Sequence, residues 1–171
     1  MSLPPPGSGS LSASPPSPAA PPLTLADVTP GDPRMSVHVR PLLRALRPAL
    51  TDDGFDRFAA QAHAQGLVFT AAYDAHGGCV AVATHRVLAT SRGRVLFVDD
   101  LVTDPGRRGG GVGARLVAHL TERARAAECC RVELDSGVTN QAAHRFYHAR
   151  RMTVSAFHFA LDVGGEGGAD G

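Results

Sequence analysis

Residues 96–116 read LFVDDLVTDPGRRGGGVGARL, a strand-like run followed by a short loop, a cluster of glycines and the start of an amphipathic helix. The first amides of a helix have no partner within the helix and carry a partial positive charge. Glycines let the backbone approach a bound anion closely, so this order predicts a cradle for a pyrophosphate. Arg107 and Arg108 can add positive charge. A flexible loop that binds nothing is the structural alternative.

Two other nucleotide-binding turns compete for these glycines. The P-loop requires a lysine, and all 17 basic residues of this chain are arginines. The dinucleotide pattern G-x-G-x-x-G/A matches Gly109, Gly111 and Ala114, with Asp135 about 20 residues further on. This match is weaker than it looks, because residues 103–108 separate the strand from the first glycine, where a dinucleotide turn is tight.

Periodicity and turn residues predict an alternating order of helices and strands around this turn. The predicted strands span residues 37–40, 67–73, 79–88, 95–102, 131–134 and 154–161. The predicted helices run from Pro41 to about Pro48, from a cap at Asp52 or Asp53 to Gly66, over 112–127 and over 140–150. Three successive strands followed by helix, strand, helix and strand indicate a mixed sheet with helices on its faces.

Composition places the chain among single-domain globular proteins. It has 171 residues, 43% of them hydrophobic, and a net charge of +1. A net charge this close to zero does not favour binding of the protein to nucleic acid. No apolar run approaches the ~20 residues of a membrane helix. The first residues lack a secretion signal, and the three cysteines do not form a disulfide framework. We therefore expect a cytoplasmic protein with no nucleic-acid or membrane partner.

The ends of the chain differ in composition from its middle. Residues 1–34 contain 10 of the 13 prolines, and we expect this segment to be disordered. The predicted domain spans 35–163, with a flexible glycine-rich tail over 164–171, and Met35 is an alternative start. The absence of Lys and Ile indicates the coding bias of a GC-rich, bacterial genome.

Two motifs resemble those of the GNAT superfamily of N-acetyltransferases. Residues 108–113, RGGGVG, fit the [Q/R]-x-x-G-x-G/A signature, and residues 140–147 resemble the second motif, N-x-x-A-x-x-F-Y. Residues 99–103 stand where the family has its fourth strand, whereas Arg151 and Met152 replace the usual Gly-Phe. The resemblance extends over about 67–161 and is weaker over 35–66.

The resemblance implies a mixed α/β fold with a twisted, mostly antiparallel sheet of about six to seven strands and about four helices. It implies an acetyl transfer from acetyl-CoA, without a metal, to a primary amine by direct attack in a ternary complex. The acceptor would be a polyamine-like, diamine-like or amino-acid-like small molecule, or a peptide, and a homodimer is compatible with the family. The alternatives are a regulatory domain that binds acyl-CoA without turnover and a nicotinamide-dinucleotide module.

The family's functional positions map onto both motifs. Pyrophosphate binding maps to Arg108, Gly109, Gly110, Gly111, Val112, Gly113 and Ala114. Pairing with the pantetheine arm maps to Leu101, Val102 and Thr103, and the family's strand usually separates from the next one at a bulge here. Asn140 would bond the same arm, and Tyr147 would protonate the departing thiolate. A side chain at Gly111 or Gly113 would occupy the space of the pyrophosphate.

Acetyl transfer also needs a proton acceptor, because an alkyl ammonium with a pKa of ~10.4 must lose a proton before it attacks. Asp99 and Asp100 are the candidates. Adjacent residues on a strand point to opposite faces unless a bulge intervenes, so we expect one of them to face the acceptor. A capping or salt-bridge role is the structural alternative for both, and packing is the alternative for Tyr147.

His144 and His148 have the i, i+4 spacing of a zinc-binding helix. The intervening residues lack the metalloprotease glutamate, and no third ligand is evident. We therefore expect no metal site.

Overall fold

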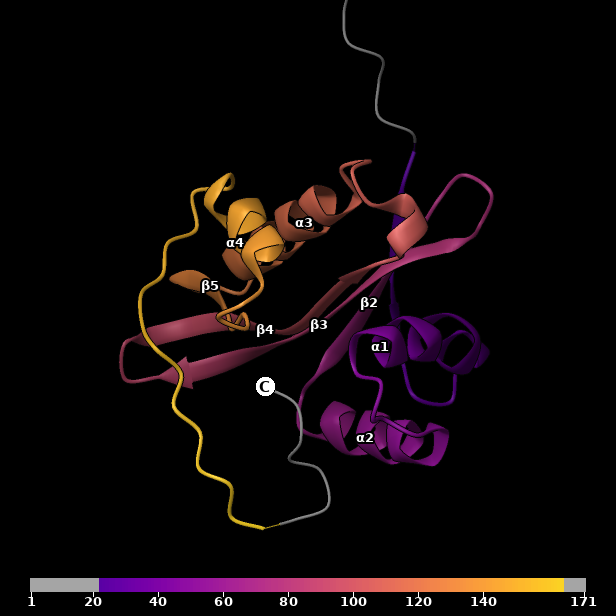
Figure 1. Cartoon of the computed structure of the whole chain (residues 1–171), viewed down its shortest axis with the longest axis horizontal. Helices are drawn as coiled ribbons and strands as arrows, with labels where there is room; N and C mark the ends of the chain where they lie inside the picture. Colours follow the sequence, from indigo (N-terminus) through magenta and orange to yellow (C-terminus); the bar gives the residue numbers. More distant parts are fainter. Residues whose placement is uncertain (1–21, 165–171) are drawn as a thin grey trace, which may run out of the picture.

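The computed structural model describes residues 22–164 and shows a five-stranded sheet between two layers of helices. The elements are β1 Thr24–Val28, η1 Met35–Val39, α1 Arg40–Leu46, α2 Asp52–Ala64, β2 Val68–Tyr73, β3 Cys79–Thr90, β4 Gly93–Thr103, η2 Pro105–Arg107, α3 Val112–Ala126, β5 Arg131–Leu134 and α4 Gln141–His148. Helices α1 and α2 lie on one side of the sheet, and α3 and α4 lie on the other (Figure 1). No described helix is long and apolar enough to cross a membrane.

The strands follow one another in chain order across the sheet. All neighbouring pairs are antiparallel except β4 and β5, which are parallel. The predicted mixed, mostly antiparallel sheet is thus confirmed, although the described residues form five strands rather than six or seven. One apolar cluster, around Phe55 and Phe69, packs under α1 and α2; a second, around Leu116 and Leu120, packs under α3.

Most predicted elements are confirmed to within a few residues, including the four main helices and β2 to β5. The cap of α2 differs from the prediction. The Thr51 hydroxyl, rather than a carboxylate of Asp52 or Asp53, accepts a hydrogen bond from the Gly54 amide at 3.1 Å. The two aspartates instead lie in the first turn, where negative charge favours the helix dipole.

The segment expected to be disordered, 1–34, contains the first strand of the sheet. Thr24–Val28 pairs with β2, and Val28 is buried. Asp27 accepts a hydrogen bond from the Thr70 hydroxyl and forms an ion pair with Arg123, both at 2.7 Å. The prediction of disorder rested on the average composition of residues 1–34. A five-residue strand changes that average little, so the prediction did not detect it. Residues 1–21 lie outside the described residues, so their predicted disorder is untested.

A variant lacking residues 1–34 should therefore be less stable, contrary to what composition alone suggests. Loss of buried Val28 and of the β1 ladder is expected to lower Tm by at least about 5 °C. Thermal denaturation measures this, with a variant lacking residues 1–21 as the control. Equal Tm values for the two variants would show that β1 adds nothing to the fold.

The strand predicted over residues 37–40 is wrong. Met35–Val39 forms a turn of π-helix that runs into α1. Met35, Val39 and Leu43 are buried, whereas Val37 is exposed. These three residues recur every fourth position, which matches one helix face, and this spacing prevails over the two-residue alternation of Val37 and Val39.

The final predicted strand, 154–161, is also absent. These residues follow α4 without regular secondary structure and are exposed. Arg151, just after α4, has a φ of 61°, and the chain then runs away from the sheet (Figure 1). The segment has the residue pattern of a strand, but it has no strand partner within the described chain.

Candidate active site

The glycine-rich turn connects the end of β4 to the start of α3. The Asp104 carboxylate accepts a hydrogen bond from the Gly106 amide at 2.9 Å and opens the short helix η2. Gly109 and Gly111 follow with φ values of 82° and 77°, in the left-handed region that favours glycine. Gly111 is the residue that precedes the first turn of α3.

The backbone amides of this turn point to an anion site. Within residues 22–164, the N–H groups of residues 109–114 donate to no protein acceptor, and the first amide of α3 with an intrahelical bond is that of Arg115, to the Gly111 carbonyl at 3.1 Å. Consecutive unpaired amides at the start of a 15-residue helix form a concentrated positive potential. The turn can therefore hold a phosphate or pyrophosphate group.

The two arginines of the turn have different environments. Arg107 forms an ion pair of 2.7 Å with Asp74 and ties the turn to the loop between β2 and β3. Arg108 is exposed and forms no ion pair with any described residue. Its guanidinium is thus available to an anion, whereas that of Arg107 is already engaged.

Gly113 has a different reason to be glycine from the one expected. A Cβ atom there would lie 3.2 Å from Cζ of Phe146 and 3.7 Å from Oγ1 of Thr103. The missing side chain therefore makes room for the Phe146 ring of α4 rather than for an anion. At Gly111, by contrast, no atom lies within 4 Å of the Cβ position, so the space expected for the ligand is open there.

The strand before the turn has a free edge. β5 pairs with β4 only from Val95 to Val98, so in the described structure Asp99–Thr103 has no neighbour on that side. Val102 is buried in the core, while Leu101 and Thr103 are half-buried. This edge can pair with an extended group that enters beside the glycine-rich turn. A nicotinamide-dinucleotide turn instead follows a strand of a parallel sheet directly, whereas β4 is antiparallel to β3.

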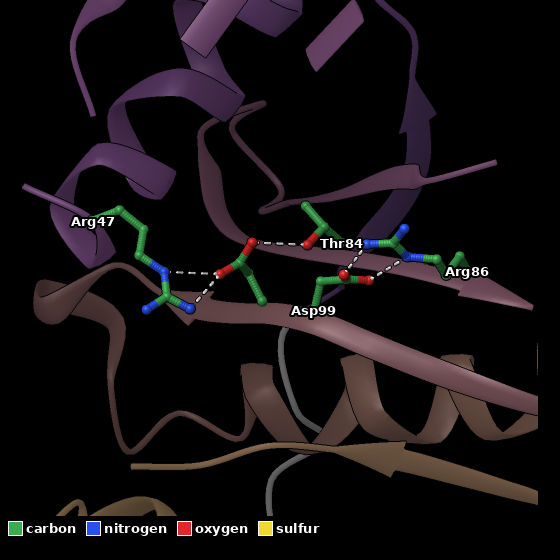
Figure 2. Close-up of polar contacts among 5 residues, drawn as sticks. Arg47, Thr84, Arg86 and Asp99 are labelled. Carbon is green, nitrogen blue, oxygen red and sulfur yellow. Dashed lines mark hydrogen bonds and ion pairs between the residues drawn. The ribbon is translucent and has the colours of Figure 1, made fainter. Parts of the chain in front are cut away.

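A β-bulge places both candidate carboxylates on one face of the sheet. Thr84 lies opposite Asp100 and His85 lies opposite Val98, which leaves Asp99 as the extra residue of β4. The bulge is the exception that the sequence allowed for: it reverses the alternation of side chains, so both aspartates, rather than one, lie on the same side of the sheet. Figure 2 shows Asp99 on the side of the sheet away from α3. Asp100 lies on the same side, where the Thr84 hydroxyl donates to it.

Both carboxylates are held by arginines. Arg47, which follows α1, donates to Oδ1 of Asp100 at 3.1 Å, and the Thr84 hydroxyl donates to Oδ2 at 3.0 Å. Arg86 of β3 binds Asp99 through two nitrogens, one of them Nε at 3.1 Å (Figure 2). The Asp99 side chain is 21% exposed and that of Asp100 is 11% exposed, so Asp99 is the more accessible of the two.

Sequence reasoning did not identify these partners. Arg47 is 53 residues from Asp100 along the chain, and no local spacing connects them. Arg86 and Thr84 alternate along β3 and so share a face, but their register with the aspartates depends on the bulge. The resemblance implied a bulge in this strand, but not its position opposite Thr84 and His85, which aligns these residues.

Asn140 and Tyr147 belong to α4. The Asn140 Oδ1 atom accepts a hydrogen bond from the Ala143 amide at 3.2 Å and caps the helix, which leaves its amide nitrogen available. Tyr147 is half-buried, with its ring edge-on to Phe146 at 5.3 Å between centroids. Burial raises the pKa of Tyr147 above its usual value of 10, so the phenol is protonated at neutral pH.

The tyrosine hydroxyl forms no hydrogen bond with any described residue. No hydrogen bond or ion pair in the described part of the chain joins Tyr147 or Asn140 to the two aspartates. The structure therefore brings Asp99 and Asp100 together with their arginines, and it leaves α4 as a separate part of the candidate site.

The histidine pair of α4 has a local role. A ring nitrogen of His144 lies 3.0 Å from the Gly137 carbonyl, and one of His148 lies 3.1 Å from the Met152 carbonyl. Each histidine thus fastens one of the loops that flank the helix. Residues 22–164 contain no cluster of three potential metal ligands.

A model of the Acetyltransferase (GNAT) family matches residues 38–152. A solved acetyltransferase from Trypanosoma brucei is 26% identical, with a TM-score of 0.65, and the match covers 82% of this chain and 99% of that one. No curated protein sequence matches.

Two further solved structures share the fold at lower identity. The glucosamine-6-phosphate N-acetyltransferase of Arabidopsis thaliana is 21% identical with a TM-score of 0.64, over 83% of this chain and 99% of that one. The aminoglycoside N-acetyltransferase AAC(6')-Iy, solved with CoA, is 17% identical with a TM-score of 0.71, over 86% and 99%.

Proposed function

Because the chain belongs to the GNAT family of acetyltransferases, we propose that it transfers the acetyl group of acetyl-CoA to a primary amine by direct attack in a ternary complex. The observation that supports this most strongly is the row of unpaired amides at residues 109–114, directly after the unpaired edge of β4. Acetyl-CoA has a pyrophosphate, which the unpaired amides can bind, next to an extended pantetheine arm, which the unpaired strand edge can bind. Two proteins of the same fold are named as N-acetyltransferases, one of glucosamine-6-phosphate and one of aminoglycosides.

The donor would lie along the turn and the edge. The pyrophosphate would accept hydrogen bonds from the amides of residues 109–114, with Arg108 supplying positive charge. The arm would pair with Leu101–Thr103, and the free amide nitrogen of Asn140 can donate to it. Backbone amides of the same edge can polarise the thioester carbonyl as it gains negative charge.

The acceptor would approach from the face that carries Asp99 and Asp100. Asp99 is the more accessible carboxylate and would take the proton of the incoming ammonium, directly or through water. The neutral nitrogen then bonds to the thioester carbon and becomes positively charged, so it must release a second proton, which water would take. The carbon–sulfur bond breaks and the sulfur leaves as a thiolate. The Tyr147 hydroxyl would give its proton to this thiolate, and water carrying the proton from nitrogen would restore the phenol.

Charge in this cluster bears on the class of acceptor. Two carboxylates are matched by two guanidinium groups, those of Arg47 and Arg86, so the cluster has no excess negative charge. A polyamine with several positive charges would therefore gain little binding energy from this cluster. Arg47 donates to Asp100 through Nε and Nη2, and its side chain is 56% exposed, so its remaining nitrogen, Nη1, can donate to the carboxylate of an amino acid or peptide. We therefore place amino-acid-like and peptide amines ahead of polyamines.

The test is an acceptor screen with acetyl-CoA over amino acids, peptide amines, aminoglycosides and polyamines, read as release of free thiol. We expect turnover with at least one class, and with monoamines that carry an anionic group first. Binding of CoA without thiol release across the whole panel would favour a regulatory domain that holds acyl-CoA. A lack of CoA binding would contradict the proposal altogether.

Tyr147→Phe separates acid catalysis from packing, because it keeps the ring against Phe146 and removes the hydroxyl. We expect kcat to fall by at least about tenfold, because proton donation by a general acid typically raises the rate by about 10²–10⁴-fold. Steady-state kinetics on the acceptor found in the screen measures this, with CoA affinity and Tm unchanged. An unaltered kcat would assign Tyr147 to packing, and a lowered Tm would assign its hydroxyl to the fold.

A further inference from the structure

A pocket opens beside the free edge of β3, under the C-terminal half of α3. β2 pairs with β3 only as far as His85, so in the described structure Arg86–Thr90 has no strand beside it on that side. The pocket has a volume of about 440 Å³, toward the lower end of the range of small-molecule sites. Its apolar lining includes Val68, Val87, Leu96 and Ala126, and its polar lining includes His85 and Arg123.

This pocket is distinct from the candidate active site. Arg123 and Ala126 of α3 line it, whereas Asp99 lies on the side of the sheet away from α3 (Figure 2). None of the residues of the glycine-rich turn or of the unpaired edge of β4 lines it. Arg86 lines the pocket and also binds Asp99, so the two sites adjoin each other around the edge of β3.

His85 carries a hydrogen-bond acceptor at this pocket. The Thr70 hydroxyl donates its one proton to the Asp27 carboxylate at 2.7 Å, so in the 3.1 Å contact between this hydroxyl and Nε2 of His85 the histidine is the donor. Burial, and next the positive charge of Arg123, lower the pKa of His85 to about 4, so the ring is neutral at neutral pH. With its proton on Nε2, the ring has a lone pair on Nδ1.

This lone pair has no partner in the described structure. His85 is 2% exposed, and its Nδ1 atom forms no hydrogen bond with any described residue. Among those residues, the polar side-chain atoms that are both sealed from solvent and without a partner are Nε of Arg40 and Nε of Arg150, so Nδ1 of His85 is not sealed. Because His85 lines the pocket, the access to Nδ1 is through it. A donor group of a ligand can therefore bind there.

Arg123 supplies positive charge to the same pocket. Its Nη1 atom donates to both oxygens of Asp27, at 2.9 Å and 2.7 Å, while its Nη2 and Nε atoms donate to no acceptor among the described residues. The side chain is 35% exposed. A guanidinium with two free nitrogens can bind a carboxylate through both of them.

We propose that this pocket binds a small 2-hydroxy acid with an apolar side group. Arg123 binds the carboxylate, the hydroxyl beside it donates to Nδ1 of His85, and the side group packs against the apolar lining. An amino acid fits less well, because its ammonium would lie near Arg123 and both oxygens of Asp27 are already bonded. Binding here is independent of acetyl transfer, since a hydroxy acid has no amine to acetylate.

The first test follows the ring nitrogens of His85 by NMR, in protein labelled with nitrogen-15 histidine, with His85→Gln used to assign the resonances. The probe is 2-hydroxy-3-methylbutanoate. We expect its titration to shift the Nδ1 resonance, because the lone pair gains a donor. The matched compound 3-methylbutanoate lacks the hydroxyl and should bind at least about tenfold more weakly. No shift of Nδ1 at about 50 mM probe, or equal affinity for the two compounds, would overturn the proposal.

A second test locates the probe by filling the pocket. Ala126→Phe adds a ring to the lining and should weaken binding of 2-hydroxy-3-methylbutanoate by about tenfold or more. Ala118→Phe is the matched control, because Ala118 is an exposed alanine of the same helix that does not line the pocket. Unchanged affinity in Ala126→Phe, or an equal loss in Ala118→Phe, would contradict this location.

A third test identifies the arginine that binds the carboxylate. Arg123→Gln should weaken binding of the probe by about tenfold or more, since a charged hydrogen bond is lost. Arg47→Gln removes the exposed guanidinium beside Asp100 instead and should leave the affinity unchanged. If Arg47→Gln weakens binding and Arg123→Gln does not, the probe occupies the candidate acceptor face and the proposal fails.

Discussion

Replacing Asp99 by asparagine is expected to lower kcat/KM by about 10²–10⁴-fold, because the amide cannot take the proton of the acceptor ammonium. The amide is close in shape to the carboxylate and its oxygen can still accept a hydrogen bond from Arg86, so the bulge should persist. Steady-state kinetics with the identified acceptor measures the effect, and titration with CoA should show unchanged donor affinity.

Asp100→Asn is the matched comparison. Asp100 is the less exposed carboxylate, and it connects Arg47 to Thr84 across the bulge. We expect a fall in kcat/KM of less than about tenfold, accompanied by a lower Tm, since the change weakens a half-buried charged hydrogen bond. The reverse order of the two effects would assign the proton transfer to Asp100 instead.

Gly111→Val is expected to weaken CoA binding by about 10²-fold or more while the chain still folds. The side chain would extend into the open space beside the unpaired amides, where it would block hydrogen bonds to the pyrophosphate that are worth about 1.5–3 kcal/mol each. Isothermal titration with CoA measures the loss. Retained affinity would show that the pyrophosphate does not lie on this turn.

A control is needed because valine at a φ of 77° also strains the backbone. Gly66 has a φ of 88° and likewise no atom within 4 Å of its Cβ position, but it follows α2, far along the chain from the glycine-rich turn. Gly66→Val should therefore cost similar stability without affecting CoA affinity. An equal loss of affinity in both variants would indicate general destabilisation rather than a blocked site.

The elements with strong periodicity could be predicted from sequence, and the site's fine geometry could not. The glycines before α3 mark the helix start by their own chemistry, and the structure places unpaired amides there as expected. The bulge at Asp99 has no comparable signal, because it depends on how β3 and β4 align. Arg47 reaches Asp100 only through the packing of α1 on the sheet, which no local pattern encodes.

Errors at the two ends of the domain have a shared cause. Strand formation depends on a partner as well as on the residue pattern. Thr24–Val28 lies in a proline-rich segment but finds β2 beside it, and it becomes a strand. Residues 154–161 alternate as a strand should, but they have no strand partner within residues 22–164. Composition and periodicity describe the segment alone and therefore miss both outcomes.

The most direct test of the proposed activity follows the acetyl group itself. Acetyl-CoA with an isotope-labelled acetyl group is incubated with the protein and the acceptor from the screen, and the acceptor is analysed by mass spectrometry. We expect one labelled acetyl group on the amine nitrogen for each free CoA released, and no transfer without the protein. Release of CoA with the label appearing as acetate, and none on nitrogen, would contradict acetyl transfer to an amine.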